Sequence, residues 1–99
     1  MNISATVYTA TMEDGTSCPA VQFPDGRRFT RFAIEMPNDM WASTSVATDE
    51  HYQAAAELAR RRLRRCSPGS DTYWWYRAVI EENNRRRKSR LTLISGGSS

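Results

Sequence analysis

Residues 73–95, with the sequence YWWYRAVIEENNRRRKSRLTLIS, constrain the fold of this chain more than any other segment. Four aromatic residues lead into a short aliphatic patch, two acids, two asparagines and a cationic block. Such a segment forms either a helix with salt bridges between successive turns or a hairpin that turns at the asparagines. The two structures place the arginines on different surfaces, so the choice also bears on function.

The helix interpretation depends on charge spacing. Asp71 would cap the helix, and Arg77, Glu81 and Arg85 would lie one turn apart on the same side. However, residues 73–80 are apolar on nearly all sides, and most of them are aromatic or β-branched types that favour strands. The two asparagines would also fall in the helix interior, where their propensity is poor.

The hairpin interpretation makes Asn83 and Asn84 a two-residue turn. Glu82 then faces Arg85, and apolar residues face apolar residues further along both strands. One face of the hairpin would be core, and the other would interleave aromatic rings with cations. We favour the hairpin because both its charges and its apolar residues find suitable partners.

The amino-terminal part of the chain predicts a three-stranded meander. Period-two alternation and β-branched residues indicate a strand at 3–11, followed by a tight EDGT turn. A short strand at 20–23 and a PDGR turn lead into a third strand at 28–36, with Phe32 on the same face as Ile34 and Met36. A loop follows at 37–47.

Residues 49–66 predict an amphipathic helix. Thr48 can cap its first free amides, and Asp49 and Glu50 suit its positive end. Its apolar stripe consists of Tyr52, Ala55, Ala56, Ala59, Leu63 and Cys66. On the opposite arc lie Arg60, Arg61, Arg64 and Arg65. Glu57 precedes these arginines by one turn and can pair with the first two.

These elements predict an α+β fold, an antiparallel sheet with one packed helix in the order β-β-β-α-β-β. The second choice, with a helix after the SPGS turn, is the order β-β-β-α-α-β. A chain of 99 residues has enough surface to bury for one small domain, which we expect at residues 1–94. Residues 95–99, SGGSS, are expected to form a flexible tail.

The charge of the chain is divided unequally. Residues 1–59 carry eight acids and three arginines, whereas residues 60–99 carry eleven bases and three acids. Clustered arginines raise the local potential well above what the net charge of +3 implies. This favours an anionic partner, either a larger protein or ribonucleoprotein complex with an acidic or nucleic-acid surface, or DNA or RNA contacted directly.

Aromatic rings interleaved with cations are typical of surfaces that bind single-stranded nucleic acid, because bases stack on the rings while cations neutralise phosphates. The hairpin would present such a surface, although its rings could instead cover a second apolar layer. The candidate residues on this segment are Tyr73, Trp75, Arg77, Arg86, Lys88 and Arg90. Those on the preceding helix are Arg60, Arg61, Arg64 and Arg65.

Signals for catalysis or a cofactor are weak. His51 is the only histidine, and we expect it to help the helix start rather than to act as a general base. Cys18 and Cys66 lack the spacing of a zinc or redox motif and are expected to be reduced. We therefore expect a binding protein and not an enzyme, with no catalytic residue, cofactor or metal. No apolar run is long enough to span a bilayer, so we expect a cytoplasmic protein with no membrane partner.

The order of three strands, an alanine-rich helix, an SPGS turn and two further strands resembles that of several anti-CRISPR proteins. These are small phage-encoded inhibitors of the nucleoprotein complexes of bacterial immunity. The resemblance covers most of the chain but is architectural, so no individual residue is carried over from it. It implies a non-enzymatic inhibitor that occupies a binding surface of such a complex in the host cell. The alternative function is a basic accessory or regulatory protein that binds nucleic acid.

Overall fold

The computed structural model describes residues 5–97, with side chains described for residues 5–89. These residues form β1 Thr6–Thr11, β2 Ser17–Gln22, β3 Arg28–Phe29, β4 Ala33–Met36, β5 Met40–Ser43, α1 Asp49–Leu63 and α2 Asp71–Gly97. The α+β class is confirmed, but the order is β-β-β-β-β-α-α, with both helices after the strands. The strands form two antiparallel sheets, one of order β1-β2-β3 and one containing β4 and β5.

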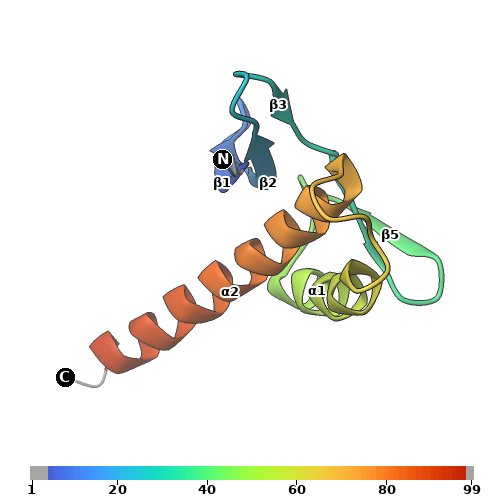
Figure 1. Cartoon of the computed structure of the whole chain (residues 1–99). Helices are drawn as coiled ribbons and strands as arrows, with labels where there is room; N and C mark the ends of the chain where they lie inside the picture. The colour runs from blue at the N-terminus through green and yellow to red at the C-terminus, as the bar shows by residue number, and fades with distance from the viewer. Residues whose placement is uncertain (1–4, 98–99) are drawn as a thin grey trace.

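Helix α2 lies between two layers of the molecule (Figure 1). Strands β1 and β2 pack against one side of its amino-terminal half, and α1 packs against another side. Strand β4 contacts α1, so the β4–β5 sheet belongs to the α1 layer. The carboxyl-terminal end of α2 extends past both layers (Figure 1).

The predicted hairpin within residues 73–95 is wrong, because α2 is continuous through the whole segment. Within residues 71–89 of α2, where side chains are described, the buried residues are Trp75, Tyr76, Ala78, Val79, Glu82 and Asn83. Their spacings of three and four place them on one side of a helix. Polar Glu82 and Asn83 continue this buried stripe where the sequence pattern calls for apolar residues. Because these two buried residues are polar, the apolar residues alone do not show the helical period, and the asparagine pair resembles a turn.

The ends of α2 also differ from expectation. Ser70 caps the helix in place of Asp71, because the Ser70 hydroxyl accepts a hydrogen bond of 3.1 Å from the backbone N–H of Tyr73. Asp71 lies in the first turn, where its carboxylate pairs with Arg27 at 3.3 Å. Residues 95–97, the start of the predicted tail, belong to the last turn of α2. Residues 98 and 99 lie outside the described part of the chain.

The amino-terminal meander is only partly confirmed. Strand β1 pairs with β2 across the expected turn, where Gly15 has a φ of 85° that suits a residue without a side chain. Residues 3 and 4 of the predicted first strand lie outside the described residues. The predicted third strand is divided between β3 and β4, which belong to different sheets. Phe32 lies in the segment between them and is 59% exposed, so it does not share the buried face of Ile34 and Met36 as predicted.

The β4–β5 hairpin occupies part of the predicted loop at residues 37–47. Met36 pairs with Met40, and the three residues between them form the connection. Two of these, Asn38 and Asp39, have φ values of 67° and 57°. Asparagine and aspartate tolerate this left-handed conformation better than most residues, so the PND sequence is a turn signal.

Helix α1 follows its prediction closely. Tyr52, Ala55, Ala56 and Ala59 are buried, and Leu63 and Cys66 pack against them. At its start, the Thr48 side chain accepts a hydrogen bond from the backbone N–H of His51, while the Thr48 N–H donates to His51 Nδ1 at 2.9 Å. This reciprocal pair is a capping box in which histidine takes the place usually held by glutamate or glutamine. The predicted role of His51 at the helix start is confirmed.

Replacing His51 by alanine is expected to lower the free energy of unfolding by about 1 kcal/mol, because the Thr48 N–H loses its acceptor. Urea unfolding followed by circular dichroism measures this change. The matched control is His51→Gln, which keeps an acceptor at the same position and should retain most of the stability. Equal stability of the alanine variant and the unmodified protein would contradict a stabilising role for this hydrogen bond.

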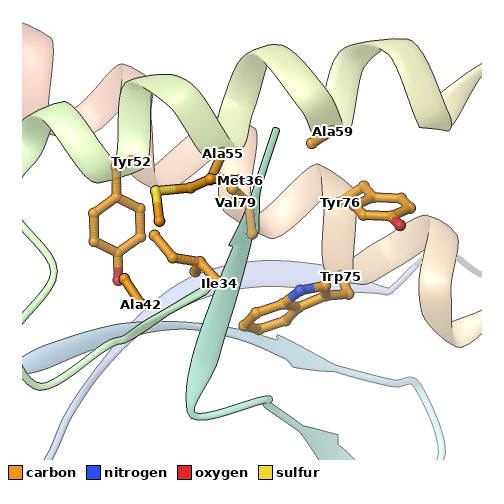
Figure 2. Close-up of a cluster of buried hydrophobic side chains, with 9 residues drawn as sticks. All are labelled: Ile34, Met36, Ala42, Tyr52, Ala55, Ala59, Trp75, Tyr76 and Val79. Carbon is orange, nitrogen blue, oxygen red and sulfur yellow. The ribbon is translucent and has the colours of Figure 1, made fainter. Parts of the chain in front are cut away.

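The main core lies between α1, α2 and the β4–β5 sheet (Figure 2). It consists of Ile34, Met36, Ala42, Tyr52, Ala55, Ala59, Trp75, Tyr76 and Val79. The alanines on α1 leave room for the larger rings of α2 (Figure 2). A smaller cluster of Val21, Phe23 and Ala78 joins β2 to α2. These two cores fix α2 in place and so determine which of its cations reach the solvent.

Candidate functional site

A buried carboxylate, Glu82, joins α2 to β1. Its side chain is 1% exposed and accepts hydrogen bonds from Thr9 Oγ1 at 2.7 Å, Arg85 Nη2 at 2.5 Å and Arg86 Nε at 2.8 Å. Burial alone would raise the pKa of Glu82, but the hydrogen bonds from Arg85, Thr9 and Arg86 outweigh it and hold the pKa below its ordinary value. Glu82 is therefore ionised at neutral pH.

Arg86, a predicted partner-binding residue, has a structural position instead. Its side chain is 18% exposed and contacts Glu82, and its Nη1 donates to Asp49 Oδ1 at 2.9 Å. The guanidinium also lies 4.1 Å from the centre of the Tyr52 ring, a cation–π distance. Arg86 thus ties α2 to the start of α1, and little of its charge is available to a ligand.

The predicted stacking surface is not assembled. Trp75 is 2% exposed and packs edge-on against Phe29, with ring centres 6.2 Å apart. Tyr73 and Trp74 are partly buried and contact each other edge-on at 5.2 Å. Arg77 donates a hydrogen bond of 3.1 Å to the Tyr73 hydroxyl. A nucleic-acid base could not reach Trp75 without unfolding of the core, so this part of the predicted site is wrong.

Exposed cations gather further along α2, in a group that we call the α2 cluster: Arg85, Arg87 and Lys88. The side chain of Arg85 is 50% exposed even though it contacts Glu82. Arg87 and Lys88 form no ion pair with any other residue whose side chain is described. Of the predicted residues, Lys88 therefore lies on an open cationic surface. The side chain of Arg90 lies outside the described part of the structure.

A second group of exposed cations, the α1 cluster, consists of Arg60, Arg61, Arg64 and Arg65. Their predicted exposure is confirmed. The predicted pairing of Glu57 with the first two is wrong, because no such ion pair forms among the described side chains. Arg62, which the sequence did not single out, instead binds Glu35 of β4 and the hydroxyl of Tyr76, and these hydrogen bonds raise its pKa.

The two clusters lie at opposite ends of the helix pair. Arg62 contacts Tyr76, and Asp49 contacts Arg86, so α1 and α2 are antiparallel. The helical rise between Tyr76 and Arg86 is about 15 Å. The α1 cluster therefore lies beside the beginning of α2, whereas the α2 cluster lies beside the beginning of α1.

A group of exposed apolar residues lies on and beside the β4–β5 hairpin, and sequence reasoning missed it. Its members are Phe32, Met40, Trp41 and Val46, each more than half exposed. Figure 1 shows β5 near the amino-terminal end of α2, far from the extended carboxyl-terminal end. A PND turn followed by MWA was the available signal, because it places apolar residues on an edge strand.

Comparisons with known proteins add no assignment. No helix within residues 5–97 is both long and apolar enough to cross a membrane. Among the described side chains, no three His, Cys, Asp or Glu residues come together in a way that could hold a metal ion. The chain matches no protein-family model, no curated protein sequence and no solved structure. The resemblance to anti-CRISPR inhibitors therefore stays a prediction.

Proposed function

We propose that this chain is a non-enzymatic binding protein whose α2 cluster holds the phosphate backbone of a nucleic acid. The main support is the position of exposed Arg85, Arg87 and Lys88 on a helix that extends from the body of the molecule (Figure 1). The charged side chains that follow Glu82 in the sequence are all basic, and exposed Glu81 is the one acid that lines the same hollow as the α2 cluster among the described residues. Such a surface releases condensed counterions when it contacts phosphates, which favours binding.

The separation of charge from exposed apolar surface favours nucleic acid over an acidic protein as the partner. Protein interfaces combine an apolar, often aromatic centre with a polar rim. Here the exposed rings of Phe32 and Trp41 belong to the β4–β5 layer, whereas the α2 cluster lies toward the other end of α2 (Figure 1). Residues 84–89 of α2 contain no apolar side chain, which suits a phosphate backbone better than an acidic protein.

The double variant Arg87→Glu/Lys88→Glu tests this proposal. We expect it to bind mixed-sequence DNA about 100-fold more weakly at low salt, because two attractive interactions with phosphate become repulsive. The slope of log affinity against log salt should fall by about two, because each neutralised phosphate accounts for about one released counterion. Fluorescence anisotropy with labelled single-stranded and double-stranded DNA measures both quantities, and thermal melting verifies that the variant is folded.

The matched control is Arg64→Glu/Arg65→Glu in the α1 cluster, which changes the net charge by the same amount. We expect a smaller loss of affinity from it, because the α1 cluster lies beside the body of the protein. An equal loss in both variants would show that binding follows net charge and not the α2 cluster. No binding of either DNA, or of RNA of the same sequence, by the unmodified protein would refute the proposed function itself.

A further inference from the structure

We infer that two copies of this chain associate through strand β5, edge to edge and antiparallel, around a two-fold axis that passes beside Trp41. The inference is independent of the proposed function, because β5 contains no residue of the α2 cluster. Within residues 5–97, β4 is the one strand that pairs with β5, so the opposite edge of β5 is open to a further strand (Figure 1). A second copy of the chain offers the same open edge in return.

The backbone of β5 directs hydrogen-bonding groups away from β4. The Thr44 N–H donates a bond of 3.0 Å to the Phe32 carbonyl, so Thr44 faces β4. Successive residues of a strand direct their backbone groups to alternate sides, so the N–H and C=O of Trp41 and the N–H of Ser43 face the open edge. A two-fold axis at Trp41 places this residue opposite its own copy, and it places Ser43 opposite Asp39 of the second copy.

The open edge of β5 lacks the features by which proteins prevent strand pairing. Residues 40–48, MWASTSVAT, contain no charged residue and no proline. Other strands have such features: β3 is two residues long and begins at Arg28, and Glu35 on β4 forms an ion pair with Arg62. Because β5 itself is uncharged, no like charges oppose each other when it pairs with its copy.

The exposed side chains at this edge suit the centre of an interface. Trp41 and Met40 on β5 are 56% and 59% exposed, and Phe32 and Val46 beside its carboxyl end are also more than half exposed. These four residues present roughly 300–500 Å² of apolar surface per copy. Two copies with their paired backbones then bury about 1,000 Å² in total, the lower limit for a specific interface. This area predicts a weak and reversible dimer.

The position of Trp41 favours a second copy over a strand from another protein. Ile34 and Ala42 point into the core, so Trp41, the neighbour of Ala42, lies on the outer face of the hairpin. Pairing about the two-fold axis sets the two Trp41 rings side by side on that face. Aromatic pairs across strands stabilise a sheet, and tryptophan at the centre of an interface commonly contributes most of its binding energy.

Sedimentation equilibrium between about 10 and 500 µM tests the inference, in about 0.5 M salt so that charge interactions are screened. We expect the average mass to rise from 11.3 kDa to twice that value and to stop there, because a two-fold interface is closed. Amide hydrogen exchange should become slower at Trp41 and Ser43 in the concentrated protein. The N–H of Thr44, which already donates to Phe32, is the internal control and should change little.

The variant Trp41→Lys places two like charges beside the axis and should weaken dimerisation at least about tenfold, with the melting temperature of the dilute protein unchanged. Gln53→Lys is the matched control, because it adds the same charge at an exposed position of α1 and should dimerise normally. Equal dimerisation of Trp41→Lys and the unmodified protein, growth beyond a dimer, or unchanged exchange at Trp41 and Ser43 would overturn the inference. A mass of 11.3 kDa at every concentration would also overturn it, and would point to a strand of another protein as the occupant.

Discussion

Replacement of Glu82 by alanine is expected to lower the free energy of unfolding by about 3 kcal/mol, because it removes one partner of a buried ion pair. The carboxylate is 1% exposed, and its loss leaves the largely buried guanidinium of Arg86 with Asp49 as its one carboxylate partner among the described side chains. The hydroxyl of Thr9 loses its acceptor at the same time. For a domain of this size the loss is a large part of the total stability. Urea unfolding followed by circular dichroism measures it.

The same residue predicts an acid limit. The pKa of Glu82 is lower in the folded protein than its ordinary value, so its stabilising contribution is fully present above the ordinary glutamate range. That contribution is lost as the pH falls through the lower folded-state pKa. The unmodified protein should therefore become less stable in acid, and Glu82→Ala should show a flatter dependence of stability on pH.

Glu81→Ala is the matched control, since Glu81 is an exposed carboxylate on the same helix. We expect its effect to be within about 0.5 kcal/mol. The double variant Glu82→Leu/Arg86→Leu should recover much of the stability, because an apolar pair needs no charge compensation. A stability loss as large for Glu81→Ala as for Glu82→Ala would contradict the assigned role of Glu82.

Replacement of Trp75 by alanine is expected to cost about 4 kcal/mol, because a large side chain is removed from a close-packed core. The indole is 2% exposed and lies in the cluster that joins α2 to α1 and the β4–β5 sheet (Figure 2). The substitution also removes the edge-on packing of the indole against Phe29. Thermal and urea unfolding followed by far-ultraviolet circular dichroism measure the change independently of tryptophan fluorescence.

Trp41→Ala removes the same side chain from an exposed position and should change stability by no more than about 0.5 kcal/mol. Trp75→Phe keeps much of the buried volume and should fall between the two. A Trp75→Ala variant that is fully stable but fails to bind nucleic acid would reverse this assignment and restore Trp75 as a ligand-stacking residue.

Residues 73–95 show why the sequence pattern failed for α2. Helix prediction depends on apolar residues at spacings of three and four, but two positions of the buried stripe hold Glu82 and Asn83. Glu82 is tolerated there because Thr9, Arg85 and Arg86 satisfy its carboxylate. Two of those partners are close in sequence, but Thr9 is 73 residues away. A local pattern has no access to such a partner.

The sequence predicted that exposed basic residues would form the candidate site, but it did not predict correctly which residues are exposed. Lys88 and the four arginines of the α1 cluster are exposed, as charge patterning indicated. Arginine and tryptophan are residue types that commonly contact ligands, yet Arg86 and Trp75 are both largely buried. Arg87 was not among the predicted site residues, but it is an exposed member of the α2 cluster because the helix turns it outward.

The amino-acid sequence was sufficient for features that depend on neighbours within a few residues. These include the capped start of α1 at Thr48, its apolar stripe, the turn at Gly15 and the concentration of positive charge after residue 59. Other features depend on long-range contacts. These are the path of α2, the division of residues 28–36 between two sheets and the burial of Arg86. Burial of a charge is favourable only when distant partners neutralise it, and folding alone brings those partners together.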